Sequence, residues 1–345
     1  MKLIAFIDTE TAVKSRKVLD IGSVKSTGEI FHSPSMNAFM EFLKGTQFIC
    51  GHNIIKHDLK YIGRGLTDIN FDTSKIIDTL FLSPLLFPKR PYHALVKDDK
   101  LQTEDKNNPL NDAKKAKDLF FDEISAFQQL SKSLQEIYYM LLGEKPEYKA
   151  FFTFLDYQSH STEIESLIRK EFYNDICQEA NLSKLIEYSP TALAYSLALI
   201  NTRSRLSITP PWVIKNYPDI ESILYQLKNN PCLPGCQYCN QALDIHRGLK
   251  KFFGFETYRT YGEEPLQEKA VKAAIDNKSI LAVFPTGGGK SITFQVPALM
   301  SGENAKGLTV VISPLQSLMK DQVDNLEKSG ITDAVTINGL SDPIE

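Results

Sequence analysis

The chain has 345 residues, of which 42% are hydrophobic and 23% are charged, and its formal net charge is −3 at pH 7. This length and apolar content predict two or three globular domains with buried cores and argue against a disordered chain. The small negative charge argues against a protein that coats nucleic acid through bulk charge, but it is compatible with a local basic groove. The N-terminus lacks the apolar core of a secretory signal, and no apolar run has membrane-spanning length, so we expect a soluble, cytoplasmic protein.

The first third of the chain has the pattern of a compact α/β domain. Short β-like runs alternate with amphipathic helix-like runs, which is typical of a sheet covered by helices. We expect strands at residues 2–8, 18–26 and 46–53, helices at 36–45, 57–65 and 112–130, and a hairpin turn at 26–29.

The pattern changes twice further along the chain. Residues from about 125 to 205 read as mostly helical, and a loop rich in proline and cysteine follows at 229–239. Beyond residue 255, strands expected at 279–284, 307–314 and 334–339 alternate with helices. We therefore predict an α/β multidomain protein with an α/β domain at 1–125, a helical module at 126–248 and a second α/β region at 249–345.

The stretch "AVFPTGGGKSITFQ" at 282–295 predicts a phosphate-binding loop. A strand that runs into a glycine-rich turn and then a helix presents backbone N–H groups to anionic oxygens. Lys290 is placed to reach the β and γ phosphates of a nucleotide, and the Ser291 hydroxyl is placed to coordinate Mg²⁺. The strict pattern is not met, because Phe284 occupies the position of the first glycine.

That departure at Phe284 is shared with a known family. "FPTGGGKS" resembles the nucleotide-binding motif of RecQ-family DNA helicases. "FFGFETYR" and "PLQEKAV" resemble the adenine-recognition element of that family. "TVVISPLQSLMKDQV", which includes Lys320, is similar to the family's next motif, which touches the DNA backbone. The spacer "TYGEEPL" is longer than in the family pattern. The resemblance implies a partial RecA-like P-loop domain that binds ATP with Mg²⁺, and DNA as the partner. The nucleotide-binding residues it implies are Arg259, Gln267, Thr286, Gly287, Gly288, Gly289, Lys290 and Ser291. The Gln267 amide, with its donor and acceptor, is suited to both hydrogen-bonding edges of adenine.

Residues 313–345 contain no pair of adjacent acids of the kind that such motors use to hold Mg²⁺ and orient water. We therefore expect the chain to be the N-terminal portion of a longer helicase, and we do not expect these residues to unwind DNA by themselves.

Four acidic residues in the first third predict a metal-dependent site. Asp8 and Glu10 lie two positions apart on an expected strand, so both side chains project from one face. Asp58 and Asp112 lie near the starts of two expected helices, and Ala113, Ala116, Leu119 and Phe120 are expected to face the core. Four carboxylates can hold two Mg²⁺ or Mn²⁺ ions, which suits phosphodiester cleavage.

This ordered set of acids resembles the DEDD exonucleases of RNase H-like fold, which digest nucleic acid from its 3′ end. The resemblance covers about residues 1–125 and implies that Asp8, Glu10, Asp58 and Asp112 are catalytic metal ligands. Asn107 and Asn108 occupy the places of that family's histidine or tyrosine base, and asparagine cannot accept a proton from water near neutral pH. Either another group substitutes, with His93 and His57 as the nearest candidates, or the domain is slow, or it binds 3′ ends or single-stranded regions without cutting.

The cysteines at 232–239 predict a second metal site. Cys232, Cys236 and Cys239 have C-x3-C-x2-C spacing, and His246 follows seven residues later. Dense thiols in a reducing compartment indicate metal binding. Radical SAM enzymes share this spacing, but they need a barrel after the motif, where this chain has a phosphate loop. Cys177 as fourth ligand permits either zinc or an iron–sulfur cluster, whereas His246 favours zinc, and we expect zinc.

Overall fold

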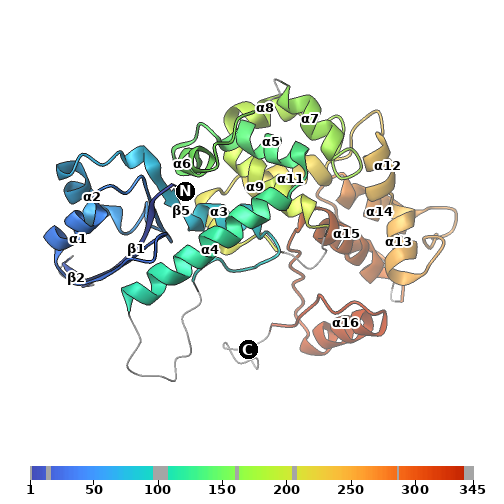
Figure 1. Ribbon diagram of the computed structural model, residues 1–345. Helices are drawn as coiled ribbons and strands as arrows, with labels where there is room; N and C mark the ends of the chain where they lie inside the picture. The colour runs from blue at the N-terminus through green and yellow to red at the C-terminus, as the bar shows by residue number, and fades with distance from the viewer. Residues whose placement is uncertain are drawn as a thin grey trace. The chain divides into compact units, whose positions relative to one another are not determined.

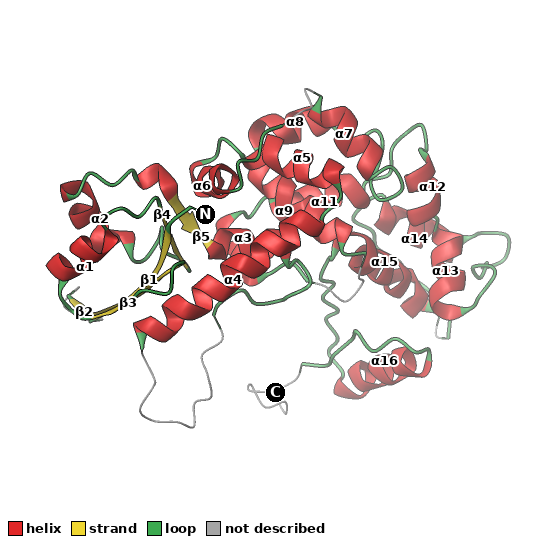
Figure 2. Cartoon of the chain, viewed as in Figure 1, coloured by secondary structure: helices red, strands yellow, loops and turns green. Residues whose placement is uncertain are grey.

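A computed structural model describes residues 2–12, 17–95, 108–159, 163–203, 208–285 and 287–337 (Figures 1 and 2). The chain forms two compact units, one of Met1–Glu171 with Leu182–Ile220 and the other of Phe172–Asn181 with Glu221–Glu345. The expected helices of the middle segment belong to the first unit, whereas the cysteine loop belongs to the second. None of the described helices is long and apolar enough to cross a membrane.

The first unit is built around a mixed five-stranded sheet with the order β3-β2-β1-β4-β5. Its strands are β1 (Ile4–Thr11), β2 (Val18–Lys25), β3 (Ile30–His32), β4 (Phe48–Gly51) and β5 (Ile76–Asp78). β1 pairs antiparallel with β2 and parallel with β4, so it is the central strand. The three strands predicted from the sequence are confirmed, and Gly28, with φ of 96°, makes the predicted hairpin turn between β2 and β3.

Helices cover both faces of this sheet. On one face, α1 (Met36–Leu43) and α2 (Leu59–Asp68) bury Phe39 and Ile62 against Ile7 and Ile49 of the strands. On the other face, α4 (Pro109–Gln129) lies along β1 and β2, and the rings of Phe6 and Phe120 are 5.7 Å apart (Figure 1). Of the four residues expected to face the core from α4, Ala113, Ala116 and Phe120 are buried and Leu119 is partly buried. The sheet therefore has the covered, two-faced form expected of an α/β domain.

The remaining helices of the first unit extend its core beyond β5. They are η1 (Thr73–Lys75), α3 (Thr79–Leu86), α5 (Lys132–Leu142), α6 (Pro146–Phe154), α7 (Ile164–Glu171), α8 (Leu182–Tyr188), α9 (Pro190–Asn201) and α10 (Pro211–Asn216). Buried hydroxyls hold this layer together, because Tyr148 and Tyr195 share a hydrogen bond of 2.6 Å and Tyr195 Oη donates to the Phe81 carbonyl at 2.8 Å. The apolar run at 192–200 lies in the buried helix α9, which agrees with the mostly helical pattern predicted for residues 125–205.

The second unit is mainly helical among its described residues. Its helices are α11 (Ile220–Lys228), α12 (Gln237–Ala242), α13 (Ile245–Phe253), α14 (Leu266–Ile275), α15 (Lys290–Ala305) and α16 (Gln316–Lys328). α15 packs against α13 and α14. Gly248 allows close packing of α13, because a Cβ atom there would lie 2.6 Å from Met300 Sδ on α15.

The strands expected in this second unit are not formed among the described residues. Residues 279–285, 307–314 and 331–337 are loops in Figure 2. Their apolar side chains face solvent: Leu281, Leu308 and Ile312 are at least 90% exposed. The sequence prediction was wrong here because alternation and β-branched residues indicate strand propensity, whereas a strand also needs a neighbour to satisfy its backbone groups.

Candidate functional site

Three of the four predicted acids converge at the surface of the first unit. Asp8 and Glu10 project from β1, and Asp112 lies in the first turn of α4, which the packing of Phe120 on Phe6 holds against that strand. Carboxylate oxygens of the three side chains lie within 4.8 Å of one another. The structure thus brings together residues about a hundred positions apart in an arrangement that a divalent cation can bridge.

Asp58 lies close to these acids but is held differently. It is buried, and its Oδ1 accepts hydrogen bonds from the backbone N–H of Thr9 at 2.9 Å and from the Thr9 hydroxyl at 2.6 Å. It is the N-cap residue of α2, as the sequence predicted, but its side chain does not cap the helix. Thr9 therefore fixes the Asp58 carboxylate against β1.

The crowding of carboxylates changes the chemistry of Asp8. Burial, followed by the negative charges of Asp58, Asp112 and Glu10, raises the pKa of Asp8 from 3.8 to about 8. A bound cation would favour the charged form and reverse this shift. The donor set consists of hard oxygen atoms, which fits Mg²⁺ or Mn²⁺.

The two histidines named as substitute bases lie in different surroundings. His57 Nδ1 is 3.6 Å from Asp58 Oδ1, its side chain is 43% exposed, and the Asp58 carboxylate raises its pKa. His93 is buried with its Nδ1 2.8 Å from the Ser83 hydroxyl, and burial lowers its pKa to about 4. Asn108 caps α4 by accepting from the Leu110 N–H at 3.0 Å, and Asn107 lies outside the described residues. Of the two histidines, His57 is therefore the one beside the acids.

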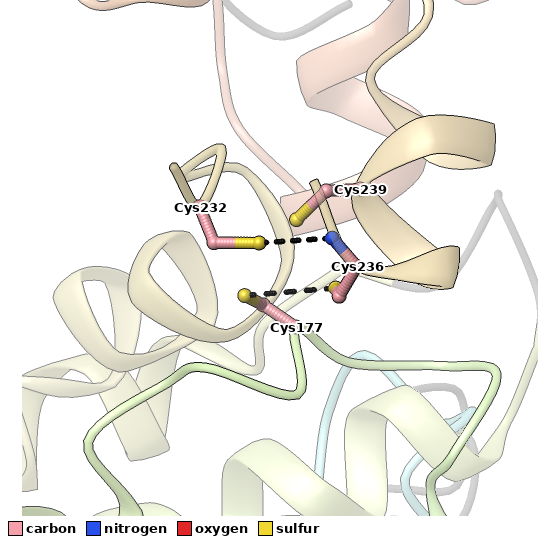
Figure 3. Close-up of side chains that lie close together, drawn as sticks. All are labelled: Cys177, Cys232, Cys236 and Cys239. Carbon is pink, nitrogen blue, oxygen red and sulfur yellow. Dashed lines mark hydrogen bonds between the residues drawn. The ribbon is translucent and has the colours of Figure 1, made fainter. Parts of the chain in front are cut away.

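The four predicted cysteines of the second unit also converge (Figure 3). Cys177 comes from the segment before α8, and Cys232, Cys236 and Cys239 come from the loop and helix near α12. Their Sγ atoms all lie within 4.8 Å of one another. The alternative ligand His246 lies elsewhere, because its Nε2 is 3.2 Å from Glu268 and its ring packs against Tyr258. The donor set that the structure assembles is four thiols.

The predicted nucleotide-binding residues meet around the glycine loop. Gly287 and Gly289 have φ of 76° and 67°, a backbone conformation that residues other than glycine rarely adopt. Gln267 is buried, with Oε1 accepting from the Arg259 N–H at 2.9 Å and Nε2 donating to the Gly289 carbonyl at 2.8 Å. Arg259 Nη1 donates to the Gly287 carbonyl at 3.3 Å, and Lys290 Nζ donates to the Phe284 carbonyl at 3.3 Å. Thr286 lies outside the described residues.

Around this loop, Tyr261 Oη donates to the Gly288 carbonyl, and Gln322 of α16 donates to the Ser291 hydroxyl at 3.0 Å. The expected adenine-recognition residues and the glycine loop therefore form one connected network of hydrogen bonds.

Sequence reasoning missed three residues that position these groups. Thr9 holds Asp58, and its place between two acids was the available signal. Asp78 is fully buried and accepts from the N–H groups of Asn53 and Ile55, which orders the loop leading to Asp58. Gln322 contacts Ser291 from the segment 309–323, for which the sequence predicted a contact with the DNA backbone instead.

Comparison with known proteins identifies part of the second unit. The family model described as DEAD/DEAH box helicase matches residues 264–342. The chain is similar to "ATP-dependent DNA helicase RecQ" of Bacillus subtilis (strain 168), with 47% identity over 93 residues, 26% of this chain and 14% of that protein. It is also similar to "ATP-dependent DNA helicase Q5" of Rattus norvegicus, with 47% identity over 83 residues, 24% of this chain and 8% of that protein.

The matched segment thus spans a small part of these relatives. No solved structure matches the chain. Residues 264–342 are a region of RecQ-type DEAD-box helicase sequence.

Proposed function

We propose that this chain is a DNA-processing protein in which a metal-dependent 3′–5′ exonuclease at residues 1–125 precedes the ATP-binding start of a RecQ-like helicase at 249–345. Residues 126–248, between them in sequence, supply further helices to the first unit and the cysteine loop to the second. The observation that carries the nuclease assignment is the convergence of Asp8, Glu10 and Asp112 within 4.8 Å. The helicase-type match supports DNA as the partner, since the similar proteins are named as DNA helicases.

Asp8, Glu10 and Asp112, with Asp58 beside them, would hold two divalent ions. Ions bound there would activate a water and stabilise the leaving oxygen of a phosphodiester. The protein residues orient these groups: Thr9 fixes Asp58, and α4 presents Asp112. His57 is the base in this proposal, because its Nδ1 lies 3.6 Å from Asp58 Oδ1 and its imidazole can accept a proton, whereas the Asn108 amide cannot.

A second candidate function follows from the same asparagine. If no base operates, the domain grips a 3′ end without cutting it, and Asn108, which is occupied as a helix cap, favours that alternative.

A nuclease assay separates the two functions. Single-stranded DNA labelled at its 5′ end and incubated with the chain and Mg²⁺ or Mn²⁺ should yield a ladder that shortens from the 3′ end. Asp8→Ala should abolish the ladder, and Asp118→Ala, an exposed acid on α4, should retain it. Binding of the same DNA without any ladder at either metal would overturn the nuclease and support the binding function.

For the helicase-like region, we propose that Arg259, Gln267 and the loop Thr286–Ser291 bind ATP with Mg²⁺. The left-handed glycines support this proposal, because they leave backbone N–H groups free of side-chain obstruction. Lys290 would turn from the Phe284 carbonyl to the phosphates. Gln267 would exchange its two internal hydrogen bonds for the two edges of adenine, so nucleotide binding would loosen its link to Gly289.

A further inference from the structure

The four cysteines Cys177, Cys232, Cys236 and Cys239 form a closed set of ligands in the second unit (Figure 3). Cys177 and Cys239 are buried, and Cys232 and Cys236 are partly buried. No histidine or carboxylate belongs to the set among the described residues. A site with four protein ligands keeps no open coordination position, which is the mark of a structural metal site rather than a catalytic one.

The spacing of the sulfur atoms distinguishes between the two metals that the sequence left open. Bonds of about 2.3 Å from one zinc ion to four thiolates at tetrahedral angles place the sulfurs about 3.8 Å apart. An iron–sulfur cluster binds different thiolates through different iron atoms, so at least some of its cysteine sulfurs must lie further apart. Here Cys177 Sγ and Cys236 Sγ are 4.0 Å apart, and all four Sγ atoms lie within 4.8 Å. We propose that the cluster holds a single tetrahedral zinc ion and not an iron–sulfur cluster.

Backbone N–H groups around the cysteine cluster donate hydrogen bonds to the sulfur atoms, which favours thiolates. The Cys236 N–H donates to Cys232 Sγ at 3.2 Å, and the Gln178 N–H donates to Cys236 Sγ at 3.5 Å. Such donors stabilise thiolates and orient them toward a metal. They come from both segments that supply ligands, so the two segments are already matched to one centre.

The zinc ion fastens a separate piece of chain to the second unit. The segment Phe172–Asn181 belongs to this unit although the residues on both sides of it belong to the other. Cys177 and Cys236 are 59 residues apart in the chain. The segment Phe172–Asn181 is also held by a hydrogen bond from the Cys177 N–H to the Leu227 carbonyl at 2.7 Å. The four thiols come together only in the folded chain, so the free energy of zinc binding adds directly to folding stability. This role is independent of nuclease or nucleotide chemistry.

Metal analysis of the 345-residue chain, purified without a metal-affinity resin, tests the proposal. We expect about one zinc per chain, and X-ray absorption at the zinc edge should show sulfur neighbours at about 2.3 Å and no metal–metal distance. Cobalt exchanged into the site should give the intense visible bands of a tetrahedral thiolate complex. Iron with acid-labile sulfide and an iron–iron distance would overturn the proposal, as would a single iron ion in place of zinc.

Cysteine variants test whether the zinc ion stabilises the fold. Cys177→Ser should lose most of the zinc and lower the thermal stability of the chain, and Cys177→His should keep zinc with weaker retention against a chelator, because histidine is a zinc ligand. Cys50→Ser removes a buried cysteine of the first unit and is the matched control, which should keep the full zinc content. A wild-type protein without metal, or one whose unfolding temperature is unchanged after chelation, would refute a structural zinc.

Discussion

Asp8 is expected to make the first unit less stable as the pH rises when no divalent ion is present. Its folded-state pKa is about 8, whereas its ordinary value is 3.8. Between these values the unfolded chain has released the proton and the folded chain still holds it, so the unfolded state binds fewer protons. Stability is therefore fully present at low pH and falls as the pH rises above about 4. At pH 7 the difference amounts to about 4 kcal/mol, from about 1.4 kcal/mol for each pKa unit.

The single tryptophan of the chain provides the assay. Trp212 belongs to the first unit and packs against Phe81 at 5.1 Å, so its fluorescence reports the unfolding of that unit. In chelator, Asp8→Asn should unfold at a higher temperature than wild type at pH 7 by about 10 °C, since a unit of this size shifts by about 2–4 °C for each kcal/mol. The two proteins should converge toward pH 4.

Addition of Mg²⁺ or Mn²⁺ should raise the unfolding temperature of wild type at pH 7 and leave Asp8→Asn nearly unchanged, because the cation replaces the proton as the partner of the carboxylates. Asp118→Asn, on the exposed side of α4, is the control and should follow wild type in every condition. Equal pH dependence in wild type and Asp8→Asn would refute the reasoning, because it would mean that the acids do not crowd Asp8.

Three further predictions concern other residues. Glu123 is fully buried, neither of its carboxylate oxygens has a hydrogen-bond partner among the described residues, and burial raises its pKa. Glu123→Leu should therefore raise the free energy of unfolding at pH 8 by about 1–3 kcal/mol, measured by Trp212 fluorescence. An unchanged free energy of unfolding would contradict the burial of an unpaired carboxylate. Lys290→Ala should remove binding of a fluorescent ATP analogue, whereas Lys269→Ala, a surface control, should bind as wild type does. Gln267→Ala should lower the unfolding temperature of the nucleotide-free chain, because it breaks two buried hydrogen bonds worth about 1 kcal/mol each, and calorimetry showing no change would argue against the network.

Local patterns in the sequence predicted the elements that carry the acids. The period of two along β1 placed Asp8 and Glu10 on one face, and the structure confirms it. β5 and α3 were missed because residues 76–86 form an almost continuous apolar run, in which neither period is visible. Asp78, which caps α3 inside that run, was the available signal, since an acid followed by an apolar stretch is typical of a helix start.

Propensity failed where tertiary partners decide the outcome. Leu281, Leu308 and Ile312 have strand-like surroundings in the sequence, yet their segments have no ladder partner among the described residues. His246 has a ligand's chemistry and a plausible spacing, but α13 directs it toward Glu268. Neither result is encoded within a window of ten or fifteen residues, because each depends on which element packs nearby.

The acidic cluster and the cysteine cluster are assembled in the same way, which explains both the successes and the failures of the sequence predictions. In each, a short motif supplies most of the ligands at fixed local spacing, and one ligand arrives from far along the chain: Asp112 joins Asp8 and Glu10, and Cys177 joins the three cysteines near α12. The local part is visible in the sequence, but an ion held by the local part alone lacks a ligand. Metal affinity therefore depends both on the ligands and on the packing that brings Asp112 or Cys177 into place. Phe120→Ala weakens the packing of α4 on β1 without touching a ligand, and it should reduce binding of Mn²⁺ in the first unit while leaving zinc in the second unit unchanged.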